Sequence, residues 1–197
     1  MKLQTGEKLD RKSQITELAE TFFHERGFLA TSMRDLAKGL KIEPASLYSH
    51  IKSKDELLWE ISNRCAGEFF ATVVPVAKSG LNTRGKLTEM IVAHVEVVCR
   101  NLRASAVFFN EWKHLAEPRR SEYANKRDEY EGFFRMVIAD GIRENLFIHF
   151  DERFSARAIL SALNWTHTWY RKDGELKPRE IGEHLSKILL DGLVRKI

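Results

Sequence analysis

Long apolar runs are missing from this 197-residue sequence, and proline and cysteine are scarce. No stretch approaches the roughly 18 apolar residues of a membrane-spanning helix. The amino-terminal segment MKLQTGEKLDRK also lacks the apolar region of a secretion signal. We therefore expect a cytoplasmic protein without a membrane segment. The 4 prolines and the short β-branched runs leave most of the chain free to form helix, so we predict an all-α fold.

Motifs for catalysis and for metal binding are missing as well. The sequence has no Gly-x-Ser-x-Gly turn, no glycine-rich phosphate loop, and no Cys or His pair at zinc-ligand spacing. Its two cysteines, Cys65 and Cys99, lie in apolar helical patterns, which favours buried thiols, with a redox-sensing pair as the alternative. We predict that the protein is not an enzyme and has no catalytic residues, no metal and no cofactor.

Charge gives little guidance to the kind of partner. The formal net charge is +4 and the pI is about 9.1, which is compatible with nucleic-acid binding. Residues 1–56 nevertheless contain ten Lys or Arg against nine Asp or Glu. A prediction of DNA binding must therefore rest on the geometry of a motif rather than on bulk charge.

Such a motif lies between Ser32 and Lys54. Ser32 with Asp35 has the spacing of a capping box, and the apolar positions that follow form one helical stripe. Pro44 is suited to the first turn of a second short helix. We expect an inner face of Leu47, Tyr48 and Ile51. The outer face is small and polar, so it can enter a DNA major groove, and consists of Pro44, Ala45, Ser46, Ser49 and His50.

The rest of the chain predicts further amphipathic helices. A first helix runs from residue 11 to Gly27, and a long helix from residue 53 to Pro75 leaves the motif. Later helices are expected over residues 86–102, 104–116, 119–144, 151–169 and 178–192. We predict about nine helices in two domains: residues 1–56 for helix-turn-helix DNA binding, and residues 57–197 for ligand binding and dimerisation.

The last two of these helices are suited to a dimer interface. The helix that begins at residue 151 has an apolar stripe of Phe154, Ala158, Ala162, Trp165 and Trp169. Two copies of a helix pair make a four-helix bundle, which predicts a homodimer. Two motifs about 34 Å apart would then bind a palindromic operator in double-stranded DNA.

Aromatic residues are abundant in the second half of the chain. For any one of them a place in a filled core is the simpler reading, but as a group they favour an apolar cavity with a few polar groups. The histidines have a structural alternative as well. The predicted effector pocket consists of His94, Phe109, Trp112, Tyr130, Phe133, Asn164, Trp165, His167 and Trp169, with Asn110 beside them.

The string IEPASLYSHIKSKDELL, with TSMRDLA before it, resembles the helix-turn-helix of TetR-family (TetR/AcrR) transcriptional regulators. The resemblance covers about residues 11–59. It implies that Arg34, Pro44, Ala45, Ser46 and Ser49 lie toward DNA bases. It likewise implies that Ser32, Tyr48, His50 and Lys54 contact phosphates.

A second resemblance concerns the effector. The segment NWTHTWYRKDGELKPREIGEHLSKILLDGL, together with FFNEWKHL, resembles TetR-type repressors of fatty-acid, steroid-ring or phenylacetate degradation. Several of those repressors respond to acyl-CoA thioesters, so the resemblance implies a repressor that such a small-molecule effector releases from DNA. Cations are available for the coenzyme, although solvated surface charge also explains them: Arg119, Arg120, Lys126, Arg127, Arg171 and Lys172. The alternatives are a sensor of hydrophobic or aromatic compounds that controls efflux, and a body that recruits a protein partner.

Overall fold

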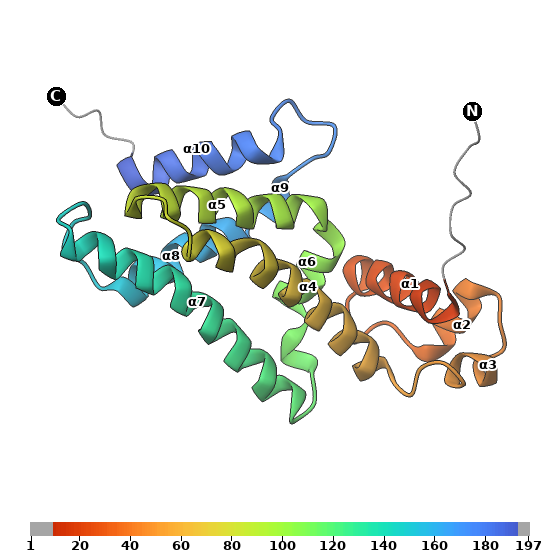
Figure 1. Cartoon of the computed structure of the whole chain (residues 1–197). Coiled ribbons are helices and arrows are strands. Elements are labelled where there is room, and N and C mark those ends of the chain that lie inside the picture. The colour runs from red at the N-terminus through yellow and green to blue at the C-terminus, as the bar shows by residue number, and fades with distance from the viewer. Residues whose placement is uncertain (1–9, 193–197) are drawn as a thin grey trace, which may run out of the picture.

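The computed structural model describes residues 10–192, which form ten α-helices and a short 3-10 helix without any β-strand (Figure 1). The all-α prediction is confirmed. Within this range no helix combines the length and the apolarity needed to cross a membrane. The helices are α1 (Arg11–Arg26), α2 (Met33–Leu40), α3 (Pro44–Tyr48), α4 (Lys54–Ala77), α5 (Thr83–Arg100), α6 (Leu102–Asn110), η1 (Trp112–His114), α7 (Arg119–Arg143), α8 (Glu152–Asn164), α9 (Thr166–Trp169) and α10 (Pro178–Asp191).

Helices α1 to α3 form a compact head whose boundaries follow from local chemistry. Gly27, with φ of +88°, ends α1 in a conformation that a side chain would strain. The Ser32 hydroxyl accepts from the Asp35 N–H at 3.1 Å, and the Asp35 carboxylate accepts from the Ser32 N–H at 2.8 Å. This capping box fixes the start of α2. Pro44 occupies the first turn of α3, as the sequence predicted.

Helix α4 connects the head to the body. It begins at the Ser53 cap and has 24 residues, which corresponds to about 36 Å at 1.5 Å per residue. The predicted end at Pro75 was wrong by two residues, because α4 continues to Ala77. A proline this close to the end of a helix removes one hydrogen bond without stopping the last turn.

The body is built around α5, which is buried along most of its length and lies between α10 and α4 (Figure 1). Gly182 allows α10 to approach α5 closely. A Cβ at this position would lie 2.7 Å from the Val92 Cα, a distance that real Cβ atoms do not reach. The two helices therefore depend on a glycine at this crossing.

Two predicted helices of the body are shorter in the structure. The helix expected over 104–116 ends at Asn110, and the helix expected over 151–169 is divided after Asn164 into α8 and α9. The apolar stripe expected on α8 points outward, with Phe154 62% and Trp165 64% exposed. The inner face of α8 consists of Ala156, Ile159 and Leu163. Helix α8 thus has an inner and an outer apolar face.

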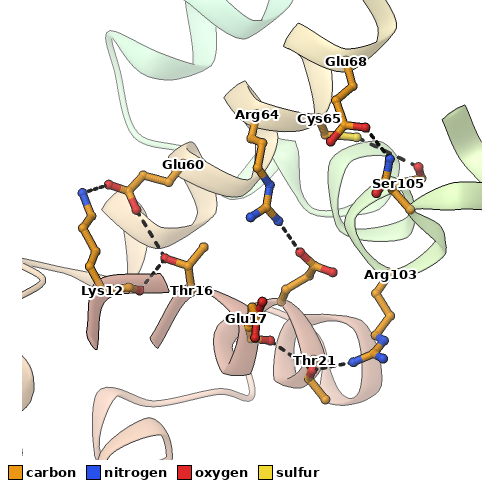
Figure 2. A network of polar contacts seen from close by, with 12 residues as sticks. Lys12, Thr16, Glu17, Thr21, Glu60, Arg64, Cys65, Glu68, Arg103 and Ser105 are labelled. Carbon is orange, nitrogen blue, oxygen red and sulfur yellow. Dashed lines mark hydrogen bonds and ion pairs between the residues drawn. The ribbon is translucent and has the colours of Figure 1, made fainter. Parts of the chain in front are cut away.

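Polar side chains join the head to the body along α1, α4 and α6 (Figure 2). Most of these groups are partly exposed, so each ion pair contributes less than about 1 kcal/mol. An apolar core that is continuous from α1 to α8 attaches the head to the body, so the surrounding polar pairs mainly determine the orientation of the head. The contacts are the ion pairs Lys12–Glu60 and Arg64–Glu20, and hydrogen bonds from Thr16 to Glu60 and from Arg103 to Thr21.

Gly182→Ala should reduce the free energy of unfolding by about 1–3 kcal/mol, because the added methyl group overlaps the Val92 backbone. Urea denaturation followed by circular dichroism measures this change. Gly67→Ala is the control, since Gly67 is exposed inside α4 and a Cβ there meets nothing within 4 Å. We expect the control to gain up to about 1 kcal/mol. Equal stability of the two variants would contradict the close packing of α10 on α5.

Candidate nucleic-acid interface and effector cavity

The outer surface of α2 and α3 presents most of the residues that the resemblance assigns to DNA. Leu47 is buried and fixes α3 to the head, and the side chains on the other face are exposed. The sequence analysis placed Tyr48 on the inner face, which is wrong, since Tyr48 is 55% exposed. Only Lys54 is partly covered, and the exposed residues are Ser32, Arg34, Pro44, Ala45, Ser46, Tyr48, Ser49 and His50.

Hydrogen bonds within the head limit what two of these side chains can do. The Ser32 hydroxyl donates to the Asp35 carboxylate and is part of the α2 cap. The Ser49 hydroxyl donates to the Ser46 carbonyl at 2.7 Å. Within residues 10–192, Arg34 has no polar partner and is free to reach a base or a phosphate.

Lys54 has a structural role that the sequence did not indicate. Its Nζ donates to the carbonyl oxygens of Phe28 at 2.7 Å and Thr31 at 2.8 Å, and lies 4.2 Å from the centre of the Phe28 ring. Burial lowers the pKa of the Lys54 ammonium. The lysine at the start of α4 therefore holds the loop between α1 and α2.

The body contacts the same loop from the opposite side. The Glu111 carboxylate accepts the Phe28 N–H at 3.2 Å, and the His114 ring stacks on the Phe28 ring with centroids 5.7 Å apart. The Asp55 carboxylate, beside Lys54, accepts from the Ala116 N–H at 2.8 Å. We call the set Phe28, Lys54, Glu111 and His114 the Phe28 junction. No pattern in the sequence indicated it, because its members are far apart in the chain.

A cavity of about 670 Å³ lies among α4 to α9, and its lining includes Asn110 and Trp112, which flank Glu111 in the chain. Its volume is within the range of small-molecule sites. About half of its lining residues have aromatic rings, and the lining includes Phe69, Phe70, His94, Phe108, Phe109, Asn110, Trp112, Tyr123, Tyr130, Asn164, Trp165 and His167.

Seven of the nine predicted pocket residues line this cavity, and two do not. Phe133 packs edge-on against Phe70 and does not line the cavity, and the neighbouring Phe134 is fully buried in the core without lining it either. Trp169 is 48% exposed at the end of α9. Arg157 from α8 is a lining residue that the sequence analysis missed.

The inner end of the cavity is buried and uncharged. Phe69 and His94 are almost fully buried and their rings are 4.6 Å apart. The His94 Nδ1 lies 2.9 Å from the Tyr130 hydroxyl. Burial lowers the pKa of His94 to about 3, and the Asn164 side chain opposes this shift. His94 is therefore neutral at physiological pH.

Charged side chains line the exposed part of the cavity, and most are already paired. Lys126 pairs with Glu122, and Arg157 pairs with Glu131. Arg127 differs, because its guanidinium packs 5.0 Å from the Trp112 ring without a carboxylate partner in the described part of the chain. Of the predicted cations, Lys126 and Arg127 line the cavity and the other four do not.

Two other predicted features concern metals and thiols. Between residues 10 and 192 no three metal-binding side chains come together. Cys65 and Cys99 are buried free thiols, as the sequence favoured, and burial raises the pKa of each to about 12. Neither thiol is activated as a nucleophile.

Comparison with protein families agrees with both halves of this arrangement. A family model described as bacterial regulatory proteins of the tetR family matches residues 15–61. A second model, described as a tetracyclin repressor-like C-terminal domain, matches residues 80–193, which is more than half of the chain. The chain belongs to the TetR family. Helices α2 and α3 are thus the helix-turn-helix of a DNA-binding transcriptional regulator, and the protein is not an enzyme.

Relatives match this TetR-family chain from end to end. The transcriptional repressor KstR2 of Mycobacterium tuberculosis is 28% identical over 193 residues, which span 97% of this chain and 96% of KstR2. The solved structure of KstR2, a ketosteroid transcriptional regulator, has a TM-score of 0.87 and covers 98% of this chain and 99% of its own.

Two further solved structures have the same fold. PfmR of Thermus thermophilus is 31% identical with a TM-score of 0.83, covering 94% of this chain and 100% of its own. AibR, solved in complex with isovaleryl coenzyme A and operator DNA, has a TM-score of 0.82 at 23% identity, covering 92% of this chain and 98% of its own. At this identity the likeness to AibR establishes the fold alone.

Lys54→Met should lower the free energy of unfolding by about 1–3 kcal/mol, because two loop carbonyls lose a charged donor. Lys52→Met is the matched control, since Lys52 is exposed and should change stability by less than about 0.5 kcal/mol. Urea denaturation measures both. If Lys54→Met instead kept the wild-type stability and the salt dependence of its DNA binding fell by about one ion, the ammonium would be assigned to a phosphate contact.

Proposed function

We propose that this protein is a homodimeric repressor that binds a palindromic operator and is released by a hydrophobic effector such as an acyl-CoA thioester. The observation on which the proposal rests is that Asn110 and Trp112 line the aromatic cavity and flank Glu111, a member of the Phe28 junction. A ligand in the cavity touches the segment that positions the helix-turn-helix. The proposal assigns residues 1–56 to DNA binding and residues 57–197 to effector binding and dimerisation.

The outer face of α8 supports the homodimer. Phe154 and Trp165 are large and exposed, and Ala158 and Ala162 between them leave room for a second helix to approach. A self-complementary face of this kind suits a two-fold interface. Ile188 of α10 is also exposed, at 47%, so the last helix presents an apolar residue of its own. A dimer through α8 and α10 would set two copies of α3 at the spacing of two operator half-sites.

The chemistry of the cavity supports an acyl thioester. Its inner end is aromatic and uncharged, which suits an acyl group, and Arg127 at the exposed part is available for a phosphate. Proteins with the same fold include AibR, which was solved with isovaleryl coenzyme A and operator DNA, and the repressor KstR2, a ketosteroid regulator. Both are consistent with a hydrophobic ligand that acts on a DNA-binding protein of this fold.

The Phe28 junction supplies the mechanism of release. Phe109, Asn110 and Trp112 line the cavity, and Glu111 lies between them in the chain with its carboxylate on the Phe28 N–H. A ligand that moves this segment moves Phe28 and, through the loop, the start of α2. Because α3 is packed on α2, the distance between the two α3 helices of a dimer changes. A mismatch of a few ångströms breaks several contacts with DNA at once, and coupling of about 1–3 kcal/mol is typical.

Acyl-CoA thioesters should release the protein from DNA, whereas the matching free acids should not. Fluorescence anisotropy on a labelled duplex from upstream of the protein's own gene measures the release. The thioester is favoured because Arg127 can bind its phosphates, and no described cation at the buried end of the cavity can bind a carboxylate. Tight DNA binding with no release by any thioester would contradict the acyl-CoA class. Efflux sensing or a protein partner would then replace it.

Glu111→Ala should uncouple ligand binding from release, because the cavity wall then loses its hydrogen bond to Phe28. We expect the effector still to bind the variant. The effector concentration that releases half of the labelled DNA, measured by fluorescence anisotropy, should rise about tenfold. Lys113→Ala is the matched control, because Lys113 is exposed in the 3-10 helix that follows Glu111. Normal release in Glu111→Ala would show that coupling runs through another route.

A further inference from the structure

The inner end of the cavity contains a polar atom without a partner. His94 is 1% exposed, and its Nε2 has no hydrogen-bond partner in the described residues. The other ring nitrogen, Nδ1, is engaged with the Tyr130 hydroxyl. The Asn164 side chain is close enough to oppose the lowering of the His94 pKa, but it makes no well-aligned hydrogen bond with Nε2. Aromatic rings also surround the imidazole, with Phe69 at 4.6 Å and Phe109 at 6.4 Å between centroids. An unpaired polar atom in such surroundings lowers stability unless a ligand or water binds it.

The number of hydrogens in the pair shows what it can bind. Neutral His94 has one N–H and Tyr130 has one O–H, and the bond between them uses only one of these two hydrogens. If the tyrosine donates to Nδ1, the free donor is the Nε2–H of His94. If Nδ1–H donates to the tyrosine, the free donor is the Tyr130 O–H. In the second arrangement Nε2 is an unpaired acceptor as well, so two polar groups lack partners instead of one. The first arrangement is therefore favoured, and its free donor is the His94 Nε2–H at the wall of the cavity.

The charge at this end limits the ligand further. Lys126, Arg127 and Arg157 lie on the partly exposed side of the cavity, and His94 and Tyr130 lie on the buried side. Among the described residues, no cation is buried beside the pair to balance an anion. The matching group is therefore an uncharged acceptor. A carbonyl oxygen fits better than a hydroxyl, because a hydroxyl would introduce a second donor hydrogen that also needs a partner.

We propose that the His94–Tyr130 pair recognises a carbonyl oxygen on the buried, apolar part of the effector. The ligand class is then a keto compound, such as an oxo-acyl thioester, rather than a plain saturated acyl chain. The inference rests on the proposed function insofar as it takes the cavity as the effector site. It does not depend on the coenzyme, because the carbonyl is bound at the end remote from the charged residues.

A fragment without coenzyme A tests the pair directly. The full-length protein is labelled with ¹⁵N-histidine, and the His94 ring signals are assigned by their loss in His94→Gln. Cyclohexanone should shift these signals, and methylenecyclohexane, which has CH₂ in place of the oxygen, should not. An equal shift with both compounds, or no shift with either, would overturn the proposal and assign the free donor to a buried water.

A pair of thioesters tests the effector class by calorimetry. We expect the wild type to bind 3-oxohexanoyl-CoA about tenfold more tightly than hexanoyl-CoA, the ratio for one added neutral hydrogen bond. His94→Leu should lose this preference, and His94→Gln, which keeps an N–H donor, should retain part of it. Equal affinity in the wild type, or an unchanged preference in His94→Leu, would overturn the proposal.

The two experiments separate this inference from the proposed function. If neither thioester binds but cyclohexanone still shifts the His94 signals, the acyl-CoA class fails and carbonyl recognition stands. If both thioesters bind and release DNA without any preference for the oxo group, the proposed function stands and carbonyl recognition fails.

Discussion

The orientation of the DNA-binding head depends on the two polar groups of one peptide segment at Phe28. Glu111 from the body accepts the Phe28 N–H, and Lys54 from α4 donates to the Phe28 carbonyl. The ring is covered by His114 on one side and approached by the Lys54 ammonium. Because Phe28 lies between α1 and α2, these directional bonds determine where α2 begins, and α3 follows α2. The head has no comparable polar attachment to the cavity wall among the described residues.

Apolar contacts attach the head to the body, whereas directional bonds set the angle between them. The hydrophobic core is continuous from Ile15 and Phe23 in α1, through Ile61 and Phe69 in α4, into the body. Hydrophobic contact is non-directional, so it keeps the head attached over a range of angles. Hydrogen bonds and ion pairs select one angle within that range, and those along α1 are partly exposed and individually weak. An arrangement of this kind lets a small free-energy change reorient the head without detaching it.

The sequence predicted what is determined within three or four residues of the chain. The Ser32–Asp35 capping box, the Gly27 end of α1 and the Pro44 start of α3 are local, and the structure has all three. Features that depend on distant contacts were missed. The helix expected to reach Ala116 ends at Asn110, where Glu111 bonds to a residue 83 positions earlier. Periodicity also found the outer apolar stripe of α8, but it missed the second, inner stripe of Ala156, Ile159 and Leu163, which packs on the body.

The sequence predicted the cavity from a group of residues, but it did not assign every residue of that group correctly. Phe133 was predicted to line the cavity, but it packs against Phe70 outside the lining, and the neighbouring Phe134 is fully buried in the core, so neither ring lines the cavity. A cavity of about 670 Å³ and an unpaired His94 nitrogen both lower the stability of the fold, because packing is lost and a donor stays unpaired. A ligand that fills the space and accepts the hydrogen bond stabilises the folded state in proportion to its occupancy. In the proposed mechanism, part of this free energy reorients the head at the Phe28 junction and thereby weakens its binding to DNA.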